Sequence, residues 1–278
     1  MWFYVPAALL YVVFFAIPTF ASFYFSLTRW TLFSSEFIGL ENYVRFFSEP
    51  QLRQGFINTF IFGVTTSGAK VVIGLALAVL LTSQIVARGY LRSVVFFPVL
   101  VSTIGVGVMF TALLDPFDGL VNSLLDSVGV DGPGWFTDPN MALLTIAGVD
   151  VWKGLGIATL IYIAGLVTIP REYYEAAQLD GAGGWQQFRR ITLPLAIPAT
   201  GTVIILSLIG GLRTFDLIWA TTGGGPGFAS DVIASVIYKQ YQAGFYGLST
   251  AGNVVLFLTV TAIMLPIMIV INRKAVER

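Results

Sequence analysis

The chain has 278 residues, of which 56% are hydrophobic and 11% are charged, and its 15 basic and 15 acidic residues give a formal net charge of zero. Soluble domains contain about 45–50% apolar and about 25% charged residues, so this composition predicts a protein that folds in an apolar solvent. The neutral balance provides no basic field for nucleic acid. The absence of His and Cys excludes disulfides, zinc fingers and His-based catalytic triads, and no metal site is expected.

Long apolar runs organise the chain. A helix needs about 20 apolar residues to cross the hydrocarbon core of a bilayer. The first run lacks a basic n-region and a cleavage pattern and is too long for a signal peptide, which predicts a retained helix. We therefore expect an all-α membrane protein with a single domain over residues 1–278 and six transmembrane helices, near residues 4–27, 56–82, 93–114, 142–169, 194–212 and 252–271.

The distribution of basic residues favours cytoplasmic termini. Short loops on the cytoplasmic side of a membrane protein are enriched in Lys and Arg. With both ends inside, the inner segments hold eight such residues in short stretches, whereas the five outer ones are spread over long connections. The last of these connections contains a turn cluster at residues 221–227, after which Ser230 and Asp231 are expected to cap a short helix that runs to about Tyr241.

The loop at residues 170–193, between the fourth and fifth helices, has the pattern of a pair of short surface helices. Pro170 suits the first turn of a helix, and Gly181 suits the left-handed conformation that ends one. Trp185 and Phe188 then begin a second short amphipathic turn. An interfacial membrane anchor is the alternative, but the mixed acidic and basic side chains favour docking against a partner protein.

The same loop resembles the cytoplasmic signature of ABC importer permeases, which reads Glu-Ala-Ala, three residues, Gly, nine residues, and Ile-x-Leu-Pro. Glu175, Ala176 and Ala177, then Gly181, then the Ile-Thr-Leu-Pro sequence at 191–194 match every fixed position. The sequence Asp-Gly-Ala at 180–182 resembles the form of this signature in the carbohydrate-uptake branch, which includes maltose-type sugar permeases. Shorter similarities extend the resemblance from about residue 37 to the end of the chain.

The resemblance implies a type I ABC importer permease fold in a bacterial cytoplasmic membrane, with a coupling helix between helices 4 and 5. It also implies a second homologous permease subunit, an ATPase dimer that carries ATP and Mg²⁺, an extracytoplasmic solute-binding protein and a sugar substrate, surrounded by membrane lipid. No cofactor and no enzymatic activity are expected in this chain. The residues implied to couple to the ATPase are Glu175, Ala176, Ala177, Asp180 and Gly181.

Polar residues within the apolar runs are candidates for the substrate path, because ionisable groups in a membrane usually have a function. Their spacing places Asp150, Lys153, Gly154 and Ile157 on one face of the fourth helix. Ser207, Gly211 and Thr214 share one face of the fifth helix. The alternatives are that Asp150 and Lys153 neutralise each other, that Lys70 forms a buried pair or snorkels, and that the small residues pack helices together. The predicted path residues are Asp150, Lys153, Gly154, Ile157, Ser207, Gly211, Thr214 and Asn253, with Trp152 and Trp219 as weaker candidates for stacking on a sugar.

Two other functional classes remain open at this point. A secondary transporter or channel would need midplane carboxylates for ion coupling and often has paired repeats, whereas only Asp150 qualifies and no repeat is seen. An intramembrane enzyme would need a nucleophile with a base or a metal cluster. A Walker A nucleotide site is excluded at Gly63 to Lys70, because Ala69 displaces the lysine and no Ser or Thr follows it.

Overall fold

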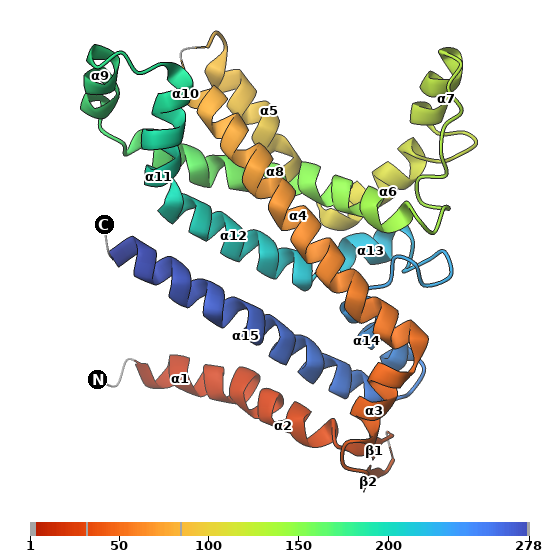
Figure 1. Ribbon diagram of the computed structural model, residues 1–278. Helices are drawn as coiled ribbons and strands as arrows, with labels where there is room; N and C mark the ends of the chain where they lie inside the picture. Colours follow the sequence, from red (N-terminus) through yellow and green to blue (C-terminus); the bar gives the residue numbers. More distant parts are fainter. Residues whose placement is uncertain (1–3, 32, 84, 277–278) are drawn as a thin grey trace.

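The computed structural model describes residues 4–31, 33–83 and 85–276, and it consists of helices apart from one small hairpin (Figure 1). The first half contains α1 (Val5–Tyr11), a π-helical turn (Val12–Ala16), α2 (Ile17–Phe25), β1 (Thr28–Trp30), β2 (Ser35–Phe37), α3 (Glu41–Ser48), α4 (Pro50–Thr82), α5 (Arg88–Leu100), α6 (Thr103–Leu113) and α7 (Leu120–Ser127). The second half contains α8 (Ala142–Val167), α9 (Arg171–Leu179), α10 (Gly184–Gln187), a π-helical turn (Phe188–Thr192), α11 (Leu193–Leu195), α12 (Ile197–Leu212), α13 (Asp216–Thr221), α14 (Ile233–Gln242) and α15 (Tyr246–Val276).

Four helical segments among the described residues are long and apolar enough to span a membrane: Val5–Phe25, Pro50–Thr82, Ala142–Val167 and Tyr246–Ile271. Two further pairs of helices meet the same criterion together but are bent, so the described residues contain up to six candidate spans if each bent pair counts as one. The expected all-α membrane architecture is therefore confirmed, with the antiparallel pair β1 and β2 as a small exception.

The third and fifth apolar runs are broken rather than continuous. Extended backbone at Val101 and Ser102 separates α5 from α6, and the two helices meet at 99°. Ala196 interrupts the fifth run, where Gly184–Leu195 and Ile197–Leu212 meet at 64°. Such breaks are tolerated in membranes where the freed backbone groups are covered by protein or line a cavity.

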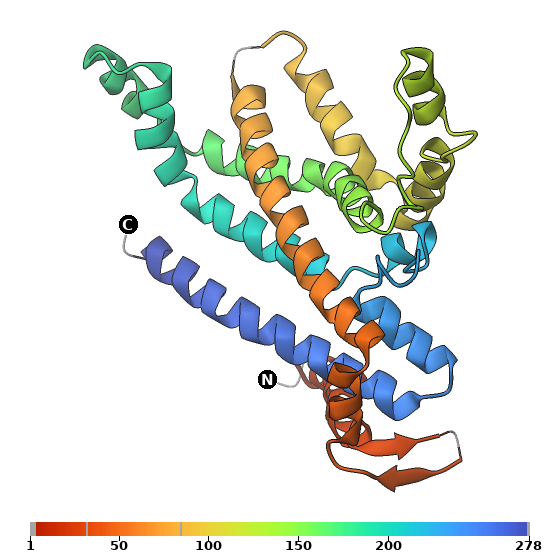
Figure 2. The same cartoon turned by 45° about the vertical axis from the view of Figure 1, so that its right-hand side comes forward.

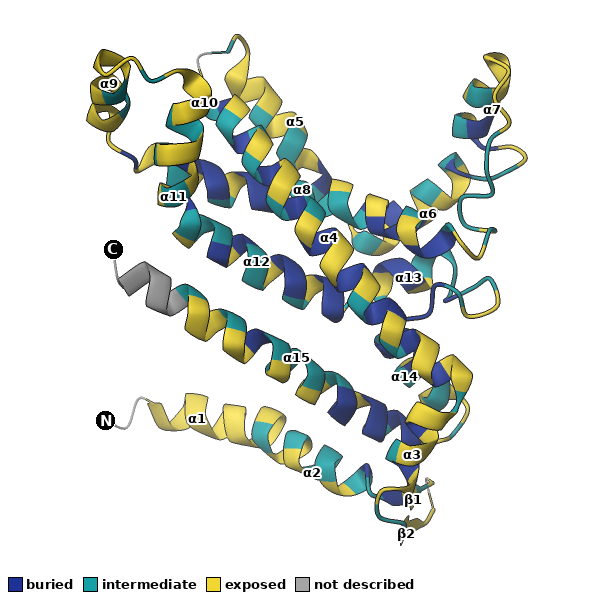
Figure 3. Cartoon of the chain, viewed as in Figure 1, coloured by how far each residue is buried: buried dark blue, intermediate teal, exposed yellow. Residues whose placement is uncertain are grey.

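The core lies where α4 crosses α8 and α12, near the middle of the molecule in both views (Figures 1 and 2). Ala78, Ala158 and Val203 pack there from the three helices, together with the fully buried Tyr162. By contrast, α1 and α2 contain no buried residue and have exposed apolar side chains, and α2 packs along α15 (Figure 3). Exposed apolar residues on spanning helices are expected to face lipid.

The two ends of the molecule differ. Figure 1 shows that α1 begins and α15 ends toward the side that carries α9, whereas β1, β2, α3 and α14 lie at the other side. We call the first the α9 end and the second the hairpin end.

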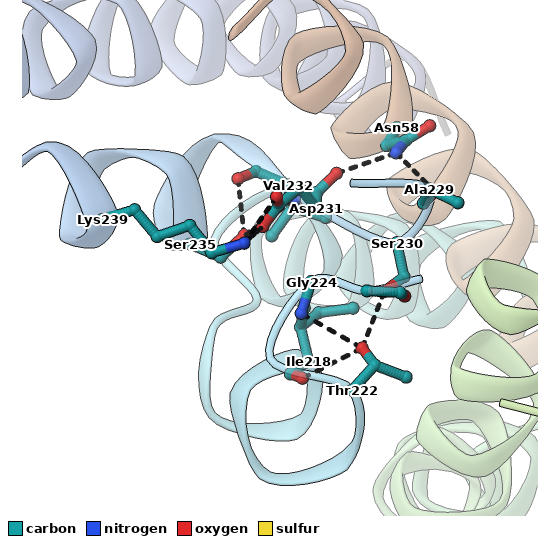
Figure 4. A network of polar contacts seen from close by, with 11 residues as sticks. Asn58, Ile218, Thr222, Gly224, Ala229, Ser230, Asp231, Val232, Ser235 and Lys239 are labelled. Carbon is teal, nitrogen blue, oxygen red and sulfur yellow. Dashed lines mark hydrogen bonds and ion pairs between the residues drawn. The ribbon is translucent and has the colours of Figure 1, made fainter. Parts of the chain in front are cut away.

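Buried hydrogen bonds attach the segment before α14 to α4 at the hairpin end (Figure 4). The Asn58 amide donates to the carbonyl oxygens of Ala229 and Asp231, each at 2.8 Å. The Asp231 carboxylate is fully buried and accepts hydrogen bonds from Lys239 Nζ and Ser235 Oγ. Burial raises the pKa of this carboxyl above its ordinary value, because desolvation outweighs the two favourable partners.

The expected cap of α14 differs from the one observed. Ser230 hydrogen-bonds to Thr222 and Gly225 instead of to the helix, and Ser235 Oγ accepts from the Val232 N–H. Asp231 does not cap the helix itself, but its carboxylate accepts a hydrogen bond from the Ser235 hydroxyl, which contacts the Val232 N–H. The segment is therefore held by its own turn and by α4, which fixes where α14 starts.

Candidate functional site

A largely buried ion pair joins α4 to α8, two of the helices that are long and apolar enough to span a membrane. Lys70 Nζ lies 2.6 Å from Asp150 Oδ2, and the two side chains are only 9% and 23% exposed. Gly154 makes room for the lysine, because a Cβ atom there would lie 2.6 Å from Lys70 Cε. The alternative that Asp150 and Lys153 neutralise each other is wrong, since Lys70 is the partner of Asp150.

The ion pair lines a pocket of about 180 Å³ between α4, α8 and α12, which we call the central pocket. Ser207 supplies a hydroxyl from α12, and that hydroxyl is also hydrogen-bonded to Ser67 of α4 at 2.8 Å. Ile157, Ile161 and Leu206 form apolar walls. A few polar groups within apolar walls are typical of sites that bind small molecules.

The central pocket brings together four of the predicted path residues: Asp150, Gly154, Ile157 and Ser207. It also contains Lys70, which the sequence analysis treated as a buried pair or a snorkelling side chain. The sequence shows one lysine, Lys70, in the second apolar run and one aspartate, Asp150, in the fourth. These two residues can be paired only once the two helices are known to be in contact.

Four other predicted path residues lie outside the central pocket. Lys153 is partly buried on α8 and forms no ion pair with any described residue. Gly211 is buried against α4, where a Cβ atom would lie 2.9 Å from Gly63 Cα, so its position favours the helix-packing alternative. Thr214 is partly buried just beyond α12, and Asn253 lines a separate pocket at the hairpin end.

The two tryptophans considered for stacking are engaged with other aromatic rings. Trp152 packs edge-on against Phe110, with ring centres 5.3 Å apart. Trp219 stacks on Phe215 and meets the ring of Tyr238 edge-on at 4.8 Å. Neither tryptophan lines the central pocket.

The loop at residues 170–193 forms an exposed projection at the α9 end (Figure 1). α9 ends at Leu179, and Gly181 follows in the left-handed conformation with φ of 78°. Tyr174 hydroxyl lies 3.0 Å from Thr192 Oγ1, which connects α9 to the segment that leads into α12. Leu179 and Trp185 are 91% and 72% exposed, so apolar surface projects beside the charged residues.

The residues predicted to couple to an ATPase lie together on this projection. Glu175, Ala176, Asp180 and Gly181 are exposed, and Ala177 is partly buried. Among the described residues, no group of three or more His, Cys, Asp or Glu side chains could hold a metal ion.

Comparisons with known proteins give consistent matches. Residues 70–274 match the family described as "Binding-protein-dependent transport system inner membrane component". The chain is 36% identical to the probable ABC transporter permease protein YurN of Bacillus subtilis, over 92% of this chain and 90% of that protein. It is 35% identical to the trehalose/maltose transport system permease protein MalF of Thermococcus litoralis, over 92% and 87% of the two chains.

The fold also matches a solved structure. A chain of a bacterial ABC transporter involved in the import of the acidic polysaccharide alginate superposes with a TM-score of 0.85. The match covers 96% of this chain and 93% of the other, at 24% sequence identity. At this identity the likeness concerns the fold, which is that of a type I ABC importer permease.

Proposed function

Because the chain belongs to the family of binding-protein-dependent inner-membrane transport components, the ABC transporter permeases, we propose that it forms half of the translocation path of a sugar importer. The relatives that match along most of this chain are permease subunits and not enzymes, which agrees with the prediction that this chain is not an enzyme. Family membership also decides against a secondary transporter, a channel and an intramembrane enzyme.

The central pocket is the observation that carries the sugar-path proposal. It places an ammonium, a carboxylate and a hydroxyl from three helices in one apolar-walled space, and sugars need both donors and acceptors. Several relatives are named for sugar transport, including trehalose/maltose and arabinooligosaccharide systems. Asp150, Gly154, Ile157 and Ser207 are the proposed path residues of this pocket, with Lys70 added to them.

The exposed loop after α8 is the proposed contact with the ATPase. Glu175 supplies a charge, while the small Ala176 and Ala177 side chains allow a close approach. The exposed Leu179 and Trp185 support a docking role, because an apolar patch bordered by charges is typical of an interaction surface. ATP and Mg²⁺ belong to the ATPase dimer, so movement of this loop would transmit its closure to α8 and α12.

The proposed assembly contains this chain, a second permease, the ATPase dimer and an extracytoplasmic solute-binding protein. Its α9 end faces the cytoplasm together with both termini, and its hairpin end faces the solute-binding protein. The alternation of the path between these two sides would be driven from the ATPase.

Charge reversal at Glu175 tests the coupling proposal. The importer is expressed with its partner subunits, and ATPase co-purification and sugar-stimulated ATP hydrolysis are compared for wild type and Glu175→Lys. We expect the variant to lose ATPase recruitment or coupling while the membrane subunit stays folded. Asp126→Lys, a charge reversal at an exposed position on α7, is the control and should leave ATPase co-purification and sugar-stimulated ATP hydrolysis unchanged.

Two outcomes would contradict the proposal at different levels. A fully coupled Glu175→Lys complex would remove Glu175 from the ATPase contact. Failure of the wild-type chain to bind any ATPase would contradict the proposed assembly itself.

A further inference from the structure

A second pocket, of about 310 Å³, lies at the hairpin end between the start of α13, α14 and α15, and we call it the outer pocket. Residues from three separate parts of the sequence form its wall. They include Phe215, Ile237, Tyr238, Tyr241, Ser249 and Asn253. Only Asn253 was predicted from the sequence as a path residue.

The lining combines aromatic faces with an available amide. The Tyr238 ring is held in place by Phe215 and Trp219, with ring centres 5.3 and 4.8 Å away. Tyr241 is 58% exposed, so much of its ring remains accessible. Among the described residues, the exposed Asn253 amide makes one long hydrogen bond, 3.4 Å to the Ser249 carbonyl.

This combination suits a pyranose ring. One face of such a ring carries C–H bonds, which are attracted to the negative face of an aromatic side chain, and its edge carries hydroxyl groups. An amide offers both a donor and an acceptor to those hydroxyls. The apolar pocket of about 520 Å³ beside α6 and α8, lined by Phe110, Leu114 and Trp152 among others, has the Thr145 hydroxyl but no side-chain amide in its lining.

The outer pocket and the central pocket have lining residues close together in the sequence. Ser207 and Gly210 of α12 line the central pocket, and Phe215, which follows that helix, lines the outer one. α12 ends at Leu212, and Phe215 follows Gly210 by five positions, so the two pockets are separated by only a short step along the chain. The outer pocket is also on the side away from α9 (Figure 1).

We propose that the outer pocket is a second sugar-binding subsite, in which a pyranose ring stacks on Tyr241 and Tyr238 and hydrogen-bonds to Asn253. It receives the sugar at the hairpin end before the sugar reaches the Lys70 and Asp150 pair. This inference rests on the proposed sugar-import function, and it adds a place and a chemistry to the outer part of the path.

The test separates binding from transport. Equilibrium binding of radiolabelled maltose and trehalose, both built of pyranose rings, is measured on the purified permease and ATPase complex in nanodiscs. The solute-binding protein is left out, so that its own affinity does not mask the membrane site. Uptake by the complete importer in proteoliposomes is measured in parallel with the same sugars.

Tyr241→Ala and Asn253→Leu should each weaken sugar binding roughly 3- to 10-fold, the range expected for the loss of one ring contact or hydrogen bond. Tyr241→Phe keeps the stacking face and should bind within about twofold of wild type. Tyr24→Ala is the matched control, because Tyr24 on α2 is 57% exposed and lines neither pocket. Folding of each variant is checked by its assembly with the partner subunits.

Three results would overturn the inference while sugar uptake by the wild type stands. They are wild-type binding in the folded Tyr241→Ala and Asn253→Leu variants, absence of any sugar binding by the wild-type complex, and loss of the second permease from both variants. The last would make the pocket a subunit interface. If the complete wild-type importer takes up none of the probe sugars, the proposed function fails and the inference fails with it.

Discussion

Lys70 and Asp150 are separated by 80 positions in the chain and yet form an ion pair at 2.6 Å. Neither residue alone is stable as an ion in an apolar surrounding, because desolvation of a charge costs several kcal/mol. Together they keep an ammonium and a carboxylate beside the central pocket. At the scale of single residues, the pair both joins two helices and supplies polar groups to the central pocket, the proposed part of the path.

Removal of one partner should therefore cost more than removal of both. Asp150→Asn leaves the Lys70 ammonium unpaired, and we expect the free energy of unfolding to fall by about 3–5 kcal/mol. The double variant Lys70→Met and Asp150→Leu removes both charges and should recover most of that loss. Thermal unfolding of the purified subunit measures the two stabilities, and a double variant less stable than Asp150→Asn would contradict the explanation.

The same double variant separates structure from function. If the pair contacts the sugar, the folded double variant should assemble with its partners but import sugar at least tenfold more slowly than the wild type. Wild-type uptake by the double variant would limit the pair to a structural role.

At the scale of elements, α4 depends on small residues where α12 crosses it. Gly63 on α4 and Gly211 on α12 face each other, and a Cβ atom on Gly211 would lie 2.8 Å from Thr66 Oγ1 and 2.9 Å from Gly63 Cα. Close contacts between small residues are a common way to associate helices in membranes. The sequence showed the glycine but not the face that it uses, because a stripe of small residues suits a path and a helix contact equally well.

Alanine substitutions at Gly210 and Gly211 test whether α12 contacts α4 closely at Gly211. Gly211→Ala forces α12 away from α4 and should lower the free energy of unfolding by about 1–3 kcal/mol. Gly210→Ala is the matched control, because no atom lies within 4 Å of its added Cβ and alanine is the better helix former. Thermal unfolding of the two variants measures the difference, and equal stability would show that the helices do not meet closely at Gly211.

At the scale of the whole molecule, the arrangement of the ends gives the proposed direction of transport. α9 and its exposed Glu175 lie at one end, and the hairpin with the outer pocket lies at the other (Figures 1 and 2). The Lys and Arg density favours the cytoplasm for the α9 end. A path from the outer pocket to the central pocket would then run inward.

The absence of native cysteine makes this orientation directly measurable. Phe37→Cys places a thiol on β2, and Gln178→Cys places one on α9, both at exposed positions. In spheroplasts, a membrane-impermeant maleimide should label the Phe37→Cys variant, and the Gln178→Cys variant only after permeabilisation. Inside-out vesicles should reverse the pattern, and labelling of both thiols in intact spheroplasts would contradict the orientation.

What the sequence by itself determined is local chemistry. Apolar runs of about 20 residues predict spanning helices wherever they occur, and the loop with Glu175 and Gly181 is exposed because its charges and turn residues suit water. What only the tertiary structure decided is which distant groups come together: Lys70 with Asp150, Gly211 with Gly63, and Asn253 in the same pocket as two tyrosines. The physical reason is that α4 and α8 are apolar nearly all round, so periodicity does not fix how each helix is rotated, and that rotation comes from close packing between helices.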